Sequence, residues 1–593
     1  MLRKPEAIES IERPLNICTT QIKWGSDAFA ETIRRLGFSF VALTPGASLA
    51  GFHDSIVNYL GNKSPQLILS LHEDNAVSIA HGFAKFTEQP MAVAIHGNVG
   101  LMNSMMSIYN AWSDRVPILL VGATSGANLS RRRPWMDWVN SGKGQNALTQ
   151  NFLKWNGDPT SVSTAIEALM RATKITGTSP SGPVYVCINQ DLHETWLSNT
   201  VQLPDPRRYA TPKSAITSDS VHNAAELLKM AKSPLILPGR VSRDLTAWKE
   251  RIQLAEKLGA LVITDNLVGS TFPTNHPLHI GYPDHRLSKQ QIKTLKSADV
   301  ILSLDKIDLA GTLRQAWPDN NVTAKIISCS LDDHTQISWS QIDQPLPPTD
   351  IEIEAQPDSA VAALCKSFGE YQGKRTNFKT DLLHTSHTPL SVKNFKGPIS
   401  MYDLAAYYLK AAAEKPVTLT RLPYRWPAEG YIFKSPLDYL GREGGAGGSA
   451  PGIAVGAALA AQWSGSIRLP IAIIGDGEFL MGHSALWSAA HYKIPLMIIV
   501  ANNRSFKNDA ERLHEITLER QRTIENIYIG TAIKNPEINI AGMARDHGLD
   551  GIGPIADINE LPTALEEGFK ALSDGKAIVL DIHIDENTDS KLN

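Results

Sequence analysis

The sequence predicts an α/β protein made of three domains, each built on a parallel β-sheet. Short apolar runs of strand length alternate with helix-forming stretches in three blocks, which is typical of parallel sheets covered by helices. The chain has 593 residues, whereas a single core stops growing at roughly 250–300 residues. Polar stretches around 203–219 and 373–398 separate the blocks. We therefore expect domains at 20–200, 210–372 and 398–586.

Each block supplies its own strands and helices. The expected strands of the first two blocks are apolar runs bounded by polar residues, at 66–71, 91–97, 117–123, 182–188, 233–239, 260–266, 299–305 and 324–330. A helix is expected at 245–258, because apolar residues recur there at spacings of three and four, namely Leu245, Trp248, Ile252, Ala255 and Leu258.

Charge, cysteine usage and hydropathy argue against several classes of protein. A net charge of −3 offers no broad basic face, so nucleic acid is not expected as a partner. Cys18, Cys187, Cys329 and Cys365 lie far apart without a CxxC spacing, which favours neither a zinc site nor a disulfide framework. The first 16 residues lack the apolar centre of a signal peptide, and no apolar run reaches the roughly 18 residues of a membrane span. We expect a cytoplasmic protein without membrane contact.

The third block carries a pattern that points to a metal. Gly-Asp-Gly at 475–477 and Asn-Asn at 502–503 each follow an apolar strand, at 469–474 and 495–501, with a helix expected at 483–491 between them. Parallel strands joined by a crossover helix end at the same edge of the sheet, so Asp476 and Asn503 should lie side by side where open α/β sheets bind ligands.

These residue types suit one kind of ligand. Carboxylate and amide oxygens are donors that Mg²⁺ accepts, and Mg²⁺ normally completes its shell with water and phosphate oxygens. Gly475 and Gly477 allow close approach of a ligand to the backbone, and the following helix directs its amides at an anion. A diphosphate bridged by Mg²⁺ fits this edge.

Two residues of the first block are candidates for acid–base chemistry. Glu73 stands at a strand-to-helix turn, where a glutamate is otherwise a partner of the helix dipole. His96 follows an apolar strand, a position that a structural histidine can also take.

The pattern in the third block is Gly-Asp-Gly followed, after 24 residues, by Asn-Asn. It resembles the thiamin diphosphate signature of the decarboxylase and acetohydroxyacid synthase superfamily. The stretch 93–123 is similar to benzoylformate decarboxylase. This resemblance implies three α/β domains that are pyrimidine-binding, central and diphosphate-binding in that order. It also implies a homodimer or homotetramer with the active site at the subunit interface.

The resemblance also implies roles for particular residues. Asp476, Asn503 and the backbone carbonyl of Ser505 would be ligands of Mg²⁺. The cofactor would lie on Gly475, Gly477 and Glu478, and the carbonyl of Gly444 would bind its amino group. Ala446 stands where the family usually has Leu, Ile or Met as an apolar support for the bent cofactor. Another side chain would then have to provide that support.

For catalysis, the resemblance implies that Glu73 hydrogen-bonds the pyrimidine ring and promotes loss of the thiazolium proton. His96 matches a histidine that donates and accepts substrate protons. The Ser-Gly-Pro-Gly of the synthases and the His-His pair of pyruvate decarboxylases are both absent.

The functional hypothesis is a thiamin diphosphate- and Mg²⁺-dependent lyase or carboligase acting on a 2-keto acid or a related carbonyl compound. An acetohydroxyacid synthase-type transferase and carbon–carbon cleavage of a diketone or an acyloin remain open. A noncatalytic scaffold is the alternative of another class, but it would not need Glu73 and Asp476. The sequence does not decide whether the central domain binds FAD.

Overall fold

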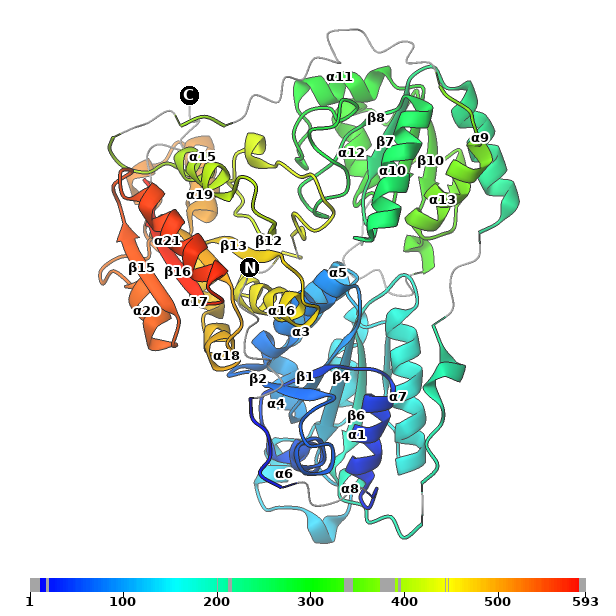
Figure 1. Cartoon of the computed structure of the whole chain (residues 1–593), viewed down its shortest axis with the longest axis vertical. Coiled ribbons are helices and arrows are strands. Elements are labelled where there is room, and N and C mark those ends of the chain that lie inside the picture. Colours follow the sequence, from blue (N-terminus) through cyan, green and yellow to red (C-terminus); the bar gives the residue numbers. More distant parts are fainter. Residues whose placement is uncertain are drawn as a thin grey trace.

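The structure is a computed structural model that describes residues 11–16, 21–199, 201–211, 216–334, 345–373, 390–392, 396–442, 444–445 and 447–585. These residues form three sheets in which every strand pairing is parallel, with helices around each sheet (Figure 1). The expected fold class, three parallel-sheet α/β units, is confirmed. The exact ends of the three domains stay a prediction.

The first sheet has six strands in the order β2-β1-β3-β4-β6-β5. Its strands are β1 Phe40–Leu43, β2 Gln66–Leu69, β3 Met91–Ile95, β4 Ile118–Thr124, β5 Trp155–Gly157 and β6 Val184–Asn189. Its helices are α1 Gly25–Arg35, α2 Ala50–Asp54, α3 Glu73–Thr87, α4 Gly97–Asn103, α5 Met105–Ser113, α6 Met136–Val139, α7 Val162–Gly177 and α8 Gln190–His193. Because β1 and β3 are neighbours, the loops that follow them meet at one edge.

The second sheet has the order β11-β10-β9-β7-β8. Its strands are β7 Pro234–Pro238, β8 Leu261–Val262, β9 Val300–Leu304, β10 Lys325–Cys329 and β11 Ile351–Ile353. Its helices are α9 Ser218–Met230, α10 Leu245–Leu258, α11 Lys289–Ser297, α12 Leu309–Ala316 and α13 Pro357–Phe368. Helix α10 has the predicted bounds, but Leu245 is 61% exposed because it is the first residue after the N-cap Asp244.

The third sheet has the order β12-β13-β14-β16-β15. Its strands are β12 Val417–Arg421, β13 Leu469–Gly475, β14 Met497–Asn502, β15 Asp550–Ile555 and β16 Ile578–His583. Its helices are α15 Met401–Ala412, α16 Ser449–Trp463, α17 Asp476–Gly482, α18 Ala485–His491, α19 Lys507–Glu519, α20 Ile540–Asp546 and α21 Leu561–Ser573. The helix expected at 483–491 is α18, and a further short helix, α17, precedes it directly after β13.

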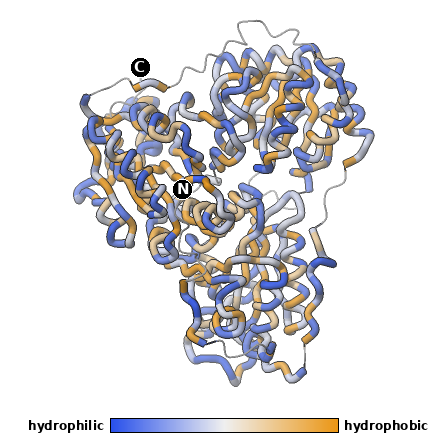
Figure 2. Tube along the Cα trace, in the orientation of Figure 1, coloured by the Kyte–Doolittle hydropathy of each residue, from blue (hydrophilic) through white to orange (hydrophobic). Residues whose placement is uncertain are grey.

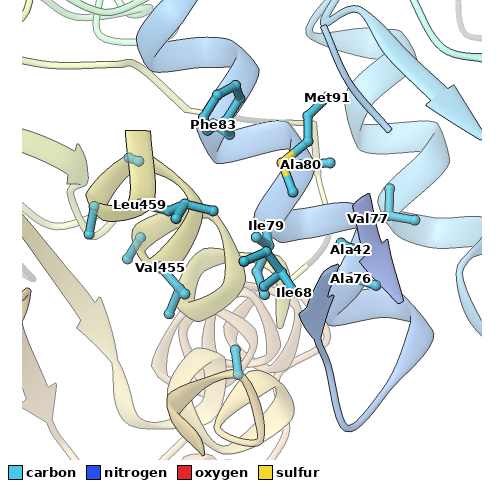
Figure 3. Close-up of a cluster of buried hydrophobic side chains, with 14 of the residues drawn as sticks. Ala42, Ile68, Ala76, Val77, Ile79, Ala80, Phe83, Met91, Val455 and Leu459 are labelled. Carbon is cyan, nitrogen blue, oxygen red and sulfur yellow. The ribbon is translucent and has the colours of Figure 1, made fainter. Parts of the chain in front are cut away.

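A buried contact between α3 and α16 joins the first sheet to the third (Figure 3). Helix α16 consists mostly of apolar and small residues (Figure 2), and nearly all of them are buried, as expected for a helix enclosed on every side. A Cβ atom added at Gly82 would lie 2.0 Å from the carbonyl oxygen of Ile453, and one at Gly456 would lie 1.9 Å from that of Ile79. The two backbones therefore touch at glycine positions.

Two further expectations concern cysteines and membranes. Cys187 and Cys329 are buried free thiols and Cys365 is also unpaired, while Cys18 lies outside the described residues. Within the described ranges, no helix has both the length and the apolar character needed to cross a membrane.

Candidate functional site

His96 lies at the carboxyl end of β3 and is the N-cap residue of α4. Its Nδ1 atom is 2.7 Å from Oγ of Ser48, in the loop after β1, and the two form a hydrogen bond. Burial lowers the pKa of His96; the carboxylate of Glu73 raises it, and Arg133 lowers it. A neutral imidazole held at Nδ1 can exchange a proton with a ligand at Nε2.

The His96 ring fits over the loop after β1 because residue 46 is glycine. A Cβ atom at Gly46 would lie 2.1 Å from Cγ of His96, inside the ring's own volume. Ser48 is 1% exposed and sits in the short helical turn Ala47–Leu49 that this loop forms. The sequence Pro-Gly-Ala-Ser thus supplies both the space for the histidine and its hydrogen-bond partner.

Glu73 is the first residue of α3, and its position at a strand-to-helix junction is as predicted. The strand itself ends earlier than expected, at Leu69, and Leu71 is 49% exposed. Oε2 of Glu73 accepts a hydrogen bond from Nδ2 of Asn103 (3.1 Å) on α4. At Gly100, an added Cβ atom would lie 3.2 Å from Oε1 of Glu73, so the lack of a side chain there keeps space beside the carboxylate.

Asp476 lies at the carboxyl end of β13 and is 2% exposed. Burial raises its pKa to about 6, opposed by backbone N–H groups that include those of Gly477, Ser505 and Arg504. Oδ2 is buried and has no hydrogen-bond partner among the described residues. Because an unpaired buried carboxylate oxygen is costly, this atom is suited to bind a cation.

The asparagine pair lies directly beside Asp476, as the spacing predicts. Gly475 pairs with Ala501 in the parallel register of β13 and β14, so the residues that follow them meet at one edge. Asn502 donates from Nδ2 to Asp581 (2.9 Å). Asn503 accepts at Oδ1 from both the N–H and the Oγ–H of Ser505, each at 3.0 Å.

These groups fit a magnesium ion better than a softer metal. The described residues contain no group of three or more His, Cys, Asp or Glu side chains able to hold a metal. One carboxylate with amide and backbone carbonyl oxygens is instead a donor set for Mg²⁺, which takes its remaining ligands from water and phosphate. Asp476, Asn503 and Ser505 could provide such a set.

A small pocket opens beside Asp476. The residues that line it are Asp476, Leu480, Asn502, Arg504, Ile533, Glu537, Ile538, Ile540 and His583. Burial lowers the pKa of His583, and Asp581 opposes that shift. The pocket therefore combines cationic, acidic and amide groups at the ends of β13, β14 and β16.

The glycines of the Gly-Asp-Gly turn after β13 and of the glycine-rich loop before α16 differ in the atoms that surround them. A Cβ atom at Gly475 would meet no atom within 4 Å, which leaves room for a ligand above the backbone. At Gly477 it would lie 2.7 Å from the Phe506 ring, so that glycine is needed for packing. At Gly444 it would lie 2.7 Å from Oδ1 of Asn110 on α5. Ala446 lies outside the described residues.

Glu478 pairs with an arginine that the sequence did not single out. Nη2 of Arg421, the last residue of β12, is 2.9 Å from Oε1 of Glu478. Ser48 and Asn103 were missed as well. Knowledge of the strand order would have identified two of these residues. Ser48 follows β1, which lies next to the strand β3 that ends before His96, and Arg421 ends β12, which lies next to the strand β13 that ends before Asp476.

Comparisons with known proteins agree on one family. The thiamine pyrophosphate enzyme N-terminal TPP binding domain matches residues 23–152, the central domain 221–363 and the C-terminal TPP binding domain 423–582. Sulfoacetaldehyde acetyltransferase of Castellaniella defragrans is 24% identical over 94% of this chain and 92% of its own length. The acetolactate synthase large subunit of Corynebacterium glutamicum is 24% identical over 81% and 75%. The crystal structure of benzoylformate decarboxylase from Polynucleobacter necessarius has a TM-score of 0.77 at 19% identity, over 95% of this chain and 99% of that one.

Proposed function

The chain belongs to the thiamine pyrophosphate enzymes, and on that premise we propose that it is a thiamin diphosphate- and Mg²⁺-dependent lyase or carboligase acting on a 2-keto acid or a related carbonyl compound. The observation that carries the proposal is the buried, unpartnered Oδ2 of Asp476 beside the second strand end that bears Asn503. The open space above Gly475 supports it, since a ligand can come close to the backbone there.

Each chemical task has a residue to perform it. Thiamin diphosphate supplies the electron sink that decarboxylation of a 2-keto acid needs and that no amino-acid side chain provides. Asp476, Asn503 and the carbonyl of Ser505 would hold Mg²⁺, and the carbonyl of Gly444 would orient the cofactor's amino group. Glu73 would hold a proton on the pyrimidine ring, with Asn103 fixing its carboxylate.

Substrate protons would pass through His96. The hydrogen bond from Nδ1 to Ser48 fixes the ring and leaves Nε2 to donate a proton to the substrate or accept one from it. Because burial lowers the pKa of His96, the neutral form that can act as a base persists to lower pH than for an exposed histidine.

The direction of Glu73 supports an active site shared between two copies of the chain. Asn75, two residues further along α3, donates to Oγ of Ser484 (2.6 Å) in the same chain's third α/β unit. Side chains two residues apart on a helix point about 200° apart. Glu73 is therefore directed away from the part of its own chain's third α/β unit that Asn75 contacts.

Exposed apolar residues surround the Glu73 side of the molecule. Leu71, Val99, Met102 and Met106 are between 42% and 51% exposed, on the strand-to-helix turn and on α4 and α5. Exposed apolar patches on a protein surface mark sites of protein–protein contact or ligand binding. We propose that it contacts a second copy in a homodimer, or in a homotetramer built from such dimers.

A substrate screen tests the proposed chemistry. Purified protein with thiamin diphosphate and Mg²⁺ is given pyruvate, branched and aromatic 2-keto acids, and diketones, while CO₂ release and product identity are followed. Decarboxylation to an aldehyde would support a lyase, and a new hydroxyketone would support a carboligase, the type of product that the acetolactate synthase relative's name indicates. Absence of thiamin diphosphate binding would overturn the proposal.

A complementation experiment tests the shared site. At a thiamin diphosphate concentration too low to load the Asp476→Ala variant, the Glu73→Gln and Asp476→Ala homodimers should both have little activity. When the two variants are coexpressed, a shared site predicts one intact site in each heterodimer, and so about a quarter of wild-type turnover. If each chain holds a complete site of its own, coexpression recovers no activity.

A further inference from the structure

Arg421 and Glu478 form a nearly buried ion pair at the edge of the third sheet. Their side chains are 5% and 14% exposed, and Nη2 of Arg421 is 2.9 Å from Oε1 of Glu478. Glu478 lies two residues after Asp476, in the first turn of α17. The pair thus stands beside the proposed metal and diphosphate.

Stability alone does not account for this pair. Removing two charges from water is costly, and apolar residues of similar volume often stabilise a protein as well or better. A glutamate here also carries the same sign of charge as a diphosphate, and repulsion between like charges is strong where water is excluded. Arg421 offsets both the burial of Glu478 and its negative charge.

The strand geometry brings Arg421 to this place. In the pairing of β12 with β13 the register shifts between Leu419 and Arg421, so Arg421 pairs with Ala472 after an irregular residue. Such a bulge interrupts the regular alternation of side chains between the two faces of the sheet, so it redirects the side chains that follow it. Arg421 lies at the end of its strand and reaches across the end of β13 to Glu478.

We propose that Arg421 is a positioning residue for the diphosphate half of the cofactor. It neutralises the Glu478 carboxylate and holds it on the β12 side of the turn, so the diphosphate and its Mg²⁺ meet a surface without an uncompensated negative charge. This inference rests on the proposed function, because it presupposes that the turn binds thiamin diphosphate.

The test compares thiamin diphosphate affinities by calorimetry at saturating Mg²⁺. Arg421→Met leaves Glu478 charged and should weaken binding by about tenfold or more, whereas Arg421→Lys keeps the charge and should weaken it less. Glu478→Gln in the Arg421→Met background should restore affinity to within about threefold of wild type. Thiamin monophosphate, which carries less charge, should show a smaller difference between wild type and Arg421→Met.

The double variant distinguishes the positioning role of Arg421 from direct binding of the phosphates by Arg421. It also provides the test if the single variant Arg421→Met does not fold. If Arg421 itself binds the phosphates, Arg421→Met/Glu478→Gln stays weak, and the inference is overturned. Wild-type affinity in a folded Arg421→Met variant also overturns it.

The matched control is Arg425→Met. Arg425 is the next arginine along the chain and pairs with Glu511 of α19, so its loss should leave cofactor affinity unchanged. If wild-type protein itself fails to bind thiamin diphosphate, it is the proposed function that fails, and the two failures are distinguished.

Discussion

His96 and Ser48 are joined by a 2.7 Å hydrogen bond across the carboxyl ends of β3 and β1, so one strand end orients the ring carried by the other. If the histidine transfers substrate protons, His96→Ala should lower turnover by 10²- to 10⁴-fold, as typical for a general acid–base group. Ser48→Ala should cost less, about tenfold, since it removes only the orientation.

The readouts for this pair are turnover, cofactor affinity and melting temperature on the same preparation. A catalytic His96 predicts little change in the last two. A His96→Ala protein that is less stable by roughly 1–3 kcal/mol yet fully active per folded molecule would mark the residue as structural.

Replacing Asp476 by Ala should weaken thiamin diphosphate binding by at least tenfold, about 1.4 kcal/mol. The reason is that Oδ2 is the unpartnered buried oxygen suited to Mg²⁺. Calorimetry with and without Mg²⁺ measures the effect. Unchanged affinity at saturating Mg²⁺ would rule out Asp476 as a metal ligand.

Glu73→Gln should retain most of the cofactor affinity and lose most of the turnover, because the amide keeps the shape of the side chain but not its charge. Proton exchange at the thiazolium carbon, followed by NMR after acid quench, reports this step directly. Asn103→Ala, which removes the 3.1 Å hydrogen bond to Glu73, should give a smaller loss of the same kind. Wild-type exchange in Glu73→Gln would contradict the role.

The free energy of unfolding should fall as the pH is lowered, because His193 is buried in the folded chain. This residue is 1% exposed, and burial lowers its pKa to about 4. Between pH 6.5 and 4 the unfolded chain binds a proton that the folded chain does not, so the free energy of unfolding falls as pH falls, by up to about 3 kcal/mol. His193→Gln should flatten this dependence in chemical denaturation at several pH values. An identical pH slope in both proteins would show that other groups cause it.

Gly82→Ala or Gly456→Ala should destabilise the protein by about 2 kcal/mol or more, since each methyl group would collide with a carbonyl oxygen of the facing helix. The control is Gly142→Ala, where a Cβ atom would have its nearest neighbour at 4.0 Å. Thermal and denaturant unfolding measure both. Equal stability of the Gly82→Ala and Gly142→Ala variants would mean that α3 and α16 can move apart at little cost in free energy.

The sequence allowed the fold class and the main site turns to be predicted because both depend on local pattern. Asp476 and the asparagine pair each follow an apolar strand, and the parallel register that joins them follows from a short crossover. The position of Glu73 at the start of α3 also follows from local pattern, whereas its role was inferred from the family resemblance and stays a prediction. These predictions need only strand ends and the geometry of a βαβ unit.

What the sequence did not reveal depends on strand order and side-chain direction. Ser48 meets His96 only because β1 lies next to β3, and Arg421 reaches Glu478 only because β12 lies next to β13. Helix α17 is another example, since it begins at Asp476, before the range 483–491 in which the sequence predicted a helix.

The glycine contact between α3 and α16 has a thermodynamic consequence for ligand binding. Helix α3 begins at Glu73, and α16 begins just after the glycine loop that contains Gly444. Because their backbones touch at Gly82 and Gly456, the helices are fixed against each other once the chain has folded. The entropy of ordering these two helix ends is then lost during folding and not when a ligand arrives, so more of the contact energy is retained as affinity.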